Sequence, residues 1–122
     1  MRGEPSHRVA HLRPDDLLER LEAAGKERFY AAYRRGQLEV ELYAPRGHDP
    51  QNPHPRDELY IVVAGSGEFV AGEKGENRYR FAAGDFLFVA AGVPHRFEKF
   101  SDDLVVWVVF YGPQGGEKVE RA

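Results

Sequence analysis

The segment Asn52-Pro53-His54-Pro55-Arg56-Asp57-Glu58 carries an imidazole and a carboxylate four residues apart. A second imidazole, His95, ends the segment Gly84-Asp85-Phe86-Leu87-Phe88-Val89-Ala90-Ala91-Gly92-Val93-Pro94-His95. Two imidazoles and one carboxylate are the ligand set of a facial triad, which leaves open positions on a divalent metal. The spacing predicts that two ligands come from one strand and the third from another. We therefore expect His54, Glu58 and His95 to bind a divalent metal ion.

His54 and Glu58 are too far apart in a straight strand to bind one ion. In an extended segment His54, Arg56 and Glu58 point the same way, and Tyr60 continues that face. At ~3.3 Å per residue, a straight strand would separate His54 from Glu58 by about 13 Å. That distance is too long for one ion, so we expect the chain to bend or bulge next to Pro53 and Pro55.

The rest of the chain has the pattern of many short strands separated by turns. Thirteen glycines and eight prolines are typical of an all-β domain. Strands are predicted at 29–33, 38–42, 59–64, 67–71, 78–81, 85–89, 95–98 and 104–111. Gly65-Ser66 predicts a two-residue hairpin, 44–55 a loop, and 14–25 a short helix. This spacing of strands indicates a sandwich or barrel.

The two segments together resemble the paired motifs of the cupin superfamily. The first motif of that family runs Gly, five residues, His-X-His, three or four residues, Glu, six residues, Gly. The second runs Gly, five residues, Pro-X-Gly, two residues, His, three residues, Asn. The matching positions here, within residues 46–99, are His54, Glu58, Gly65, Gly84, Gly92 and His95. The resemblance implies an all-β double-sheet jelly-roll barrel with a short N-terminal helix.

The chain departs from the family pattern at three positions. Ala90 stands for the proline and Lys99 for the asparagine of the second motif, and we expect these two to affect only turn chemistry and the barrel exterior. Asn52 stands for the first histidine, so one imidazole of the usual three-His, one-Glu set is replaced by a poorer amide ligand. His48 and Gln51, in the preceding loop, are alternative donors.

Four further side chains are candidates for the pocket. Arg56 could bind a carboxylate or phosphate as a fork, or lie solvated at the rim. Tyr60, Phe97 and Trp107 either line the pocket or pack in the core. We expect one cupin domain over 1–122, with an N-terminal segment at 1–27, the barrel at 28–112 and a polar tail at 113–122.

Composition narrows the partners and the compartment. The net charge of −3 gives no drive toward nucleic acid or an anionic membrane, and the absence of cysteine excludes thiolate ligands and disulfides. The apolar runs are too short to cross a bilayer, and no apolar leader opens the chain, so we expect a cytoplasmic protein. Both faces of 59–64 and 104–111 are apolar, which predicts an outer face covered by the helix or by a second subunit of a homodimer.

These observations lead to one functional hypothesis and two alternatives. We expect a metal-dependent enzyme, of dioxygenase or isomerase type, acting on a small polar molecule. The ligand set suits iron, manganese, nickel and zinc. The alternatives are a module that binds a small ligand or metal without turnover, and a structural barrel in which His54, Glu58 and His95 form a relict polar cluster.

Overall fold

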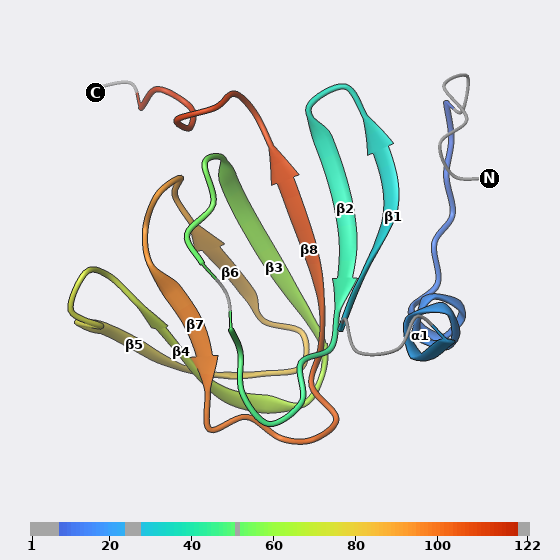
Figure 1. Cartoon of the computed structure of the whole chain (residues 1–122), viewed down its shortest axis with the longest axis horizontal. Helices are drawn as coiled ribbons and strands as arrows, with labels where there is room; N and C mark the ends of the chain where they lie inside the picture. Colours follow the sequence, from blue (N-terminus) through green and yellow to red (C-terminus); the bar gives the residue numbers. More distant parts are fainter. Residues whose placement is uncertain (1–7, 24–27, 51, 120–122) are drawn as a thin grey trace.

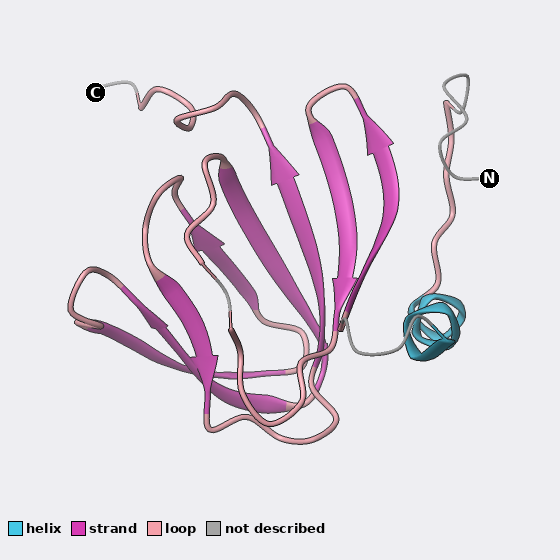
Figure 2. Cartoon of the chain, in the orientation of Figure 1, coloured by secondary structure: helices cyan, strands magenta, loops and turns pink. Residues whose placement is uncertain are grey.

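The structure, a computed structural model, describes residues 8–23, 28–50 and 52–119. These residues form one helix and eight strands (Figures 1 and 2). The elements are α1 (Pro14–Ala23), β1 (Phe29–Arg35), β2 (Leu38–Tyr43), β3 (Asp57–Ala64), β4 (Ser66–Ala71), β5 (Asn77–Ala82), β6 (Phe86–Val89), β7 (His95–Glu98) and β8 (Val105–Tyr111). The predicted helix and strands are therefore present, with ends that differ by a few residues. Residues 24 and 25 of the predicted helix lie outside the described part.

The strands make two antiparallel sheets that enclose one core. The larger sheet has the order β1-β2-β8-β3-β6, and the smaller one the order β5-β4-β7 (Figure 1). Side chains from the facing sides of both sheets form the core: Tyr43, Tyr60, Val62, Phe69, Phe81, Val89, Phe97, Leu104, Val106 and Val108. This arrangement confirms the expected all-β double-sheet barrel with a short helix before it.

The predicted hairpin at Gly65-Ser66 is wrong. β3 pairs with β6 and β8, whereas β4 pairs with β5 and β7, so the chain passes from one sheet to the other at Gly65. Gly65 has a φ of 94°, and a Cβ there would lie 2.7 Å from the Cα of Leu104. Only glycine fits this corner, and the local sequence of a corner is the same as that of a tight hairpin turn.

The helix α1 covers part of the outer face of the larger sheet (Figure 1). Leu17 and Leu21 are buried there against Ala32, Leu42 and Val105. The sequence suits the start of a helix here. Pro14 is the first helical residue, and Asp15 and Asp16 lie in the first turn, where the helix dipole stabilises negative charge. The helix thus covers the outer face over β1, β2 and the start of β8. It is one of the two covers predicted from the sequence, the other being a second subunit.

The outer face at the other end of the sheet is open. Ile61 on β3 is 41 % exposed, and Phe86 and Phe88 on the edge strand β6 are 60 % and 49 % exposed. In the described part of the chain, no helix is long and apolar enough to span a membrane.

Candidate metal centre

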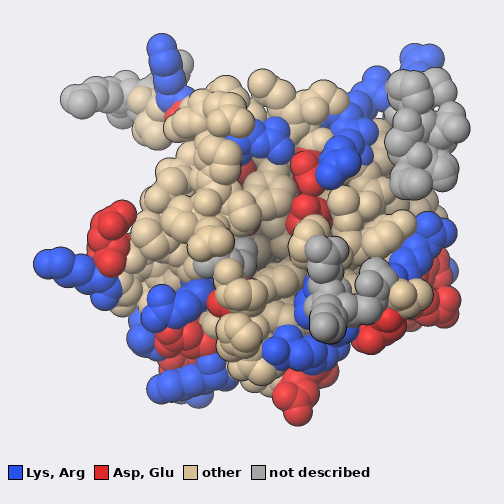
Figure 3. Space-filling model, in the orientation of Figure 1, with Lys and Arg blue, Asp and Glu red and all other residues tan. Residues whose placement is uncertain are grey.

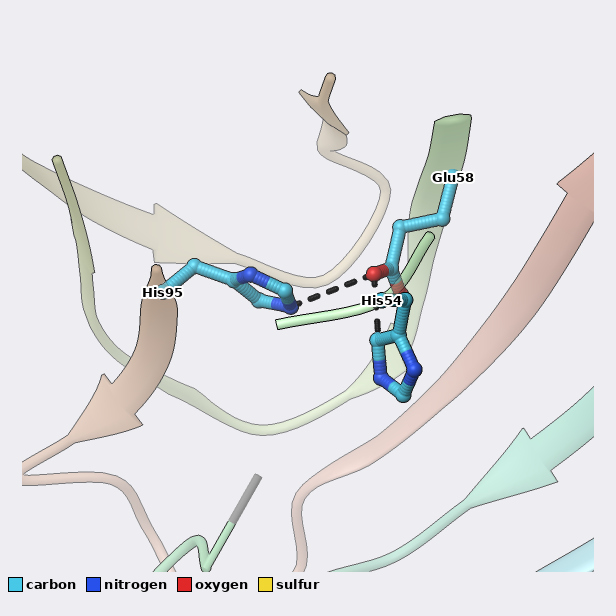
Figure 4. A group of neighbouring side chains, drawn as sticks. All are labelled: His54, Glu58 and His95. Atoms are coloured by element: carbon cyan, nitrogen blue, oxygen red, sulfur yellow. Dashed lines mark ion pairs between the residues drawn. The ribbon is translucent and has the colours of Figure 1, made fainter. Parts of the chain in front are cut away.

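One strand from each sheet and the loop before β3 bring the predicted ligands together. His54 lies just before β3, Glu58 lies within β3, and His95 begins β7 of the smaller sheet. Nε2 of His95 lies 3.3 Å, and Nε2 of His54 3.8 Å, from Oε1 of Glu58 (Figure 4). One ligand atom from each of the three residues lies within 4.8 Å of the others. This separation is compatible with a single ion bound between them.

The chain bends between His54 and Glu58, as the distance argument required. β3 begins only at Asp57, and Pro55 and Arg56 form a bend. The His54 ring then packs edge-on against Phe110 of β8, with ring centroids 4.9 Å apart. The bend replaces a straight-strand separation with a contact between the two side chains.

Two other segments hold this bend in place. The backbone carbonyl of His54 accepts a hydrogen bond from the Gly92 N–H (2.7 Å), and that of Pro55 accepts one from the Gly115 N–H (2.7 Å). The buried carboxylate of Asp57 accepts the N–H of Ala91 at one oxygen and that of Glu117 at the other, each at 2.9 Å. The turn before His95 and the C-terminal tail therefore both fix the segment that carries His54.

Glu58 is the least satisfied polar group of the site. Its side chain is 1 % exposed, and its Oε2 has no hydrogen-bond partner among the described residues. A buried carboxylate oxygen without a partner is costly, and buried charges are normally paired or bound to a metal. A carboxylate with one free oxygen beside two imidazoles fits a divalent cation, which His54, Glu58 and His95 would hold.

His95 is oriented by a backbone carbonyl. Its Nδ1 donates to the carbonyl oxygen of Val93 (2.9 Å), which leaves Nε2 directed toward Glu58 and toward the hydroxyl of Tyr60, 2.9 Å away. Such a partner on the second ring nitrogen is usual for imidazole ligands. Burial opposes the charged form of His95, but hydrogen bonds with Glu58 and Val93 outweigh it and raise the pKa of His95.

A cavity of about 750 Å³ meets the site at His54, whereas Glu58 and His95 are buried behind it and do not line it. His54 is part of its wall, and the loop before β3 closes one side. Asp49, buried in that loop, accepts hydrogen bonds from the Tyr43 hydroxyl and from the Phe97 N–H (2.8 Å), which ties the loop to both sheets. Figure 3 shows acidic and basic side chains close together near the middle of this face of the molecule.

The three candidate substitutes for the missing imidazole have different positions. Asn52 and His48 line the cavity and are exposed, and Gln51 lies outside the described residues. Among the described histidines and acidic residues, His48 does not join the group of His54, Glu58 and His95. Asn52 therefore lines the cavity at the position where the first motif usually has a histidine.

Arg56 also lines the cavity, at its rim. Its guanidinium donates to the backbone carbonyl of Gln37 and, at 3.5 Å, to that of Gly112, and lies 4.0 Å from the carboxylate of Glu39. These contacts join the β1–β2 turn to the end of β8 and occupy donors that a substrate fork would need.

The three aromatic candidates take different places. Tyr60 is fully buried and reaches the site only through its hydroxyl. Phe97 packs in the barrel core against Tyr60 and Phe81, and it does not line the cavity. Trp107 packs against the core cluster of the helix on the outer face of the larger sheet and does not line the cavity, so core packing is the alternative that the structure has. Both faces of β8 are apolar, so its sequence could not show which face points inward.

Two functional candidates were missed by the sequence analysis: Glu39 and Glu41 of β2 line the cavity. Leu38, Val40 and Leu42 alternate with the glutamates, and in a half-buried strand the polar side chains usually face solvent. The structure has the opposite orientation, because α1 covers Leu42 on the outer face and the glutamates turn inward. The only sequence signal was the unpaired apolar face of the predicted helix, which needed a partner surface.

Comparison with known proteins agrees with this geometry. The Cupin domain model matches residues 39–111. An uncharacterized protein of Streptomyces coelicolor, SCO3923, is 37 % identical over 101 residues, which are 81 % of this chain and 93 % of that protein. The dimethylsulfoniopropionate lyase DddQ of Ruegeria pomeroyi is 31 % identical over 72 residues, 58 % of this chain but only 35 % of the lyase.

A solved structure extends the likeness beyond the matched sequence. BH2720 from Bacillus halodurans superposes with a TM-score of 0.73 over 93 % of this chain and 88 % of that one, at 16 % identity, which speaks for the fold alone. The family model covers more than half of the chain, and the Streptomyces relative matches nearly end to end. The chain belongs to the cupin family.

Proposed function

We propose that this protein is a metal-dependent enzyme that acts on a small polar molecule bound inside the barrel. The observation that carries the proposal is Glu58, a buried carboxylate beside two imidazoles whose Oε2 has no hydrogen-bond partner within the described part of the chain. Bound there, iron, manganese, nickel or zinc would supply a Lewis acid, and iron or manganese also a redox centre.

The residues of the site would have separate roles in such an enzyme. His54, Glu58 and His95 would hold the ion, and Val93 fixes which nitrogen of His95 is available. With three protein ligands, positions stay open for a substrate. The cavity has the size of a site for a small molecule, and Phe110 and Val108 give its wall an apolar part. A dioxygenase-type or isomerase-type reaction is compatible with this arrangement, and the partial likeness to a lyase adds elimination.

Two other functions are kept as outcomes of the test. Asn52, in place of an imidazole, favours a module that binds a small ligand or a metal without turnover. A structural barrel with a relict cluster would leave the Glu58 oxygen without any partner, which makes it the least favoured.

The test begins with the metal content of protein purified without added metal. We expect near-stoichiometric iron, manganese, nickel or zinc in the natural protein, and at least a tenfold loss in His54→Ala and His95→Ala. His48→Ala is the matched control, because His48 lines the same cavity but lies outside the three-residue group. Unchanged metal content in His54→Ala and His95→Ala would show that the ligand set is wrong.

Turnover separates an enzyme from a binding module. The metal-loaded protein would be assayed for oxygen uptake and for conversion of small carboxylic acids, phosphorylated sugars and dimethylsulfoniopropionate. Conversion that falls in His95→Ala and persists in His48→Ala supports the enzyme. Bound metal with no conversion across this panel supports the module.

We also infer that the protein forms a homodimer through the open outer face. Paired positions across the strands place Phe86, Ile61 and Trp107 in one apolar row, and Phe88, Leu59 and Val109 in the next. We expect Phe88→Glu to convert a dimer into a monomer in light scattering after size exclusion. Tyr79→Glu is the control, since Tyr79 is equally exposed (54 %) on the other sheet. A monomeric natural protein at micromolar concentration would contradict the inference.

A further inference from the structure

Two glutamates face the cavity from β2, two strands away from Glu58 in the same sheet. Glu39 and Glu41 are two residues apart on β2, so their side chains share a face, and both line the cavity. Glu39 is paired with Phe110 on β8, which is in turn paired with Glu58 on β3. Two strand spacings, roughly 10 Å between backbones, therefore separate this pair from the metal-ligand carboxylate. A small molecule in the cavity can contact His54 of the candidate metal centre and the two glutamates, because all three line it.

The two carboxyl groups are hydrogen-bonded to each other. An ionised carboxylate is only an acceptor, so this bond requires one proton between the pair. Arg34 of β1 donates to Glu39 at 3.2 Å, and Arg56 lies 4.0 Å from it, whereas no ion pair within 4.0 Å is found for Glu41 among the described residues. Glu39 is therefore the charged partner and Glu41 the protonated one.

The surroundings of Glu41 hold that proton near neutral pH. Burial is the main cause, followed by the hydrogen bond to Glu39 and its charge, and together they raise the pKa of Glu41 to about 8. Arg34 acts in the opposite direction, and the Glu58 charge on β3 acts weakly in the same one. The neighbouring strand β8 presents Val108 and Phe110 to the cavity and no charge.

We propose that Glu41 is the proton donor for an oxygen-bearing small molecule bound in the cavity between β2 and the candidate metal centre. The proposal rests on the proposed function, which supplies the bound molecule. In the transfer, the O–H bond of Glu41 breaks, an O–H bond forms on an oxygen of the molecule, and the electron pair stays on the Glu41 carboxylate. Arg34 then faces two carboxylates instead of one, and solvent returns the proton after release.

The first experiment measures the proton directly in the metal-free protein. Infrared spectra at pH 7 should contain the carbonyl band of a protonated carboxyl group in the natural protein and in Glu73→Gln, an exposed control on the β4–β5 turn. The band should be lost in Glu41→Gln and should titrate away above pH 8. A band absent at pH 7, or unchanged in Glu41→Gln, would overturn the assignment.

The second experiment asks whether Glu41 faces a bound molecule. Acetate would be added to the zinc-loaded protein, and the Glu41 carboxyl followed by carbon NMR across pH. We expect acetate to raise the Glu41 midpoint by about 0.5 pH unit, because a nearby anion favours the protonated form. An unchanged midpoint would overturn the proposal.

The two proposals fail in different ways. A protein that binds no zinc would overturn the proposed function, and with it the donor role. A protein that binds zinc through His54 and His95 but has an ordinary Glu41 midpoint would overturn the donor role alone. Glu41→Gln should keep zinc affinity within about twofold, since Glu41 is not one of the three ligand residues.

Discussion

The hydroxyl of Tyr60 lies 2.9 Å from Nε2 of His95, the nitrogen that would bind a metal. Because Nδ1 of His95 donates to Val93, the neutral ring has its lone pair on Nε2. In the neutral form of the metal-free protein this lone pair accepts the Tyr60 proton, whereas in the protonated form, which Glu58 favours, Nε2–H donates to the Glu58 carboxylate. An ion bound by His95 would take the same lone pair, so Tyr60 and the metal compete for one atom.

Replacing Tyr60 by Phe tests this competition. We expect Tyr60→Phe to lower the free energy of unfolding of the metal-free protein by about 1 kcal/mol, the usual contribution of one hydrogen bond. With saturating zinc the loss should be smaller, because the bond is no longer made. Urea unfolding with zinc and with chelator gives both values. An equal loss in the two conditions would show that Tyr60 and the metal do not share Nε2.

The raised pKa of Glu41 should make the protein less stable as the pH rises. Its pKa is raised by burial and by Glu39 to about 8 in the folded protein, above the ordinary value of 4.5. The folded state therefore binds more protons, and this contribution is complete below about pH 4.5 and is lost as pH rises to about 8. The natural protein should lose about 2 kcal/mol relative to Glu41→Gln between pH 5 and pH 8.5, less than a fully buried group would show.

Urea unfolding of both proteins at several pH values measures this difference for the Glu39–Glu41 pair, because groups outside the pair titrate alike in the two. Glu73→Gln should follow the natural protein at every pH. A constant difference between the natural protein and Glu41→Gln would contradict the prediction.

Gly65 and Gly84 form a matched pair for the sheet-switching corner. Their φ angles are nearly equal, at 94° and 95°. A Cβ at Gly65 would lie 2.7 Å from Leu104 and 2.8 Å from Ser101, whereas at Gly84 it would meet nothing within 4 Å. We expect Gly84→Ala to cost about 1–2 kcal/mol from backbone strain alone, and Gly65→Ala to cost about 2 kcal/mol more. Thermal or urea unfolding compares them, and equal losses would show that the corner can relax.

Lys99 stands where the second cupin motif has asparagine, and its backbone has a conformation that asparagine adopts more readily. Its φ is 51°, and it is the one non-glycine residue with positive φ among those described. Asparagine, which the motif has at this position, adopts that conformation more readily than lysine. We expect Lys99→Asn to raise the free energy of unfolding by about 0.5 kcal/mol without changing metal content. A loss of stability would show that the Lys99 side chain contributes more than its backbone costs.

The metal ligands were predictable because their signal is local in type and spacing. His54, Glu58 and His95 follow from residue identity and the paired motifs, and the bend before β3 follows from the length of an extended chain. Their metal binding is still a prediction. His95 reaches the other two because β7 pairs with β4 in the second sheet. The resemblance to the cupin motifs implied this proximity, whereas the alternation of residues along the strands could not show it.

The inward glutamates and the outward Trp107 could not be predicted for a different reason. Alternation shows which side chains share a face of a strand, but not which face is turned to the interior. In β2 the usual rule fails because α1 buries the apolar face from outside, which leaves Glu39 and Glu41 to the cavity. That choice depends on the packing of an element at least 15 residues away in sequence.

The contacts of Gly115 and Glu117 affect how shortened or tagged versions of this protein should be made. Gly115 and Glu117 donate to Pro55 and Asp57, on either side of the bend that carries His54. A shortened version ending at Gly112, or a bulky C-terminal fusion that displaces these residues, would remove one hydrogen bond from the buried Asp57 carboxylate and one from the carbonyl of the exposed Pro55. Such a protein would still fold its sheets, yet it would hold His54 from one side only. A purification tag is therefore better placed at the N-terminus, where metal content can be measured on an undisturbed ligand.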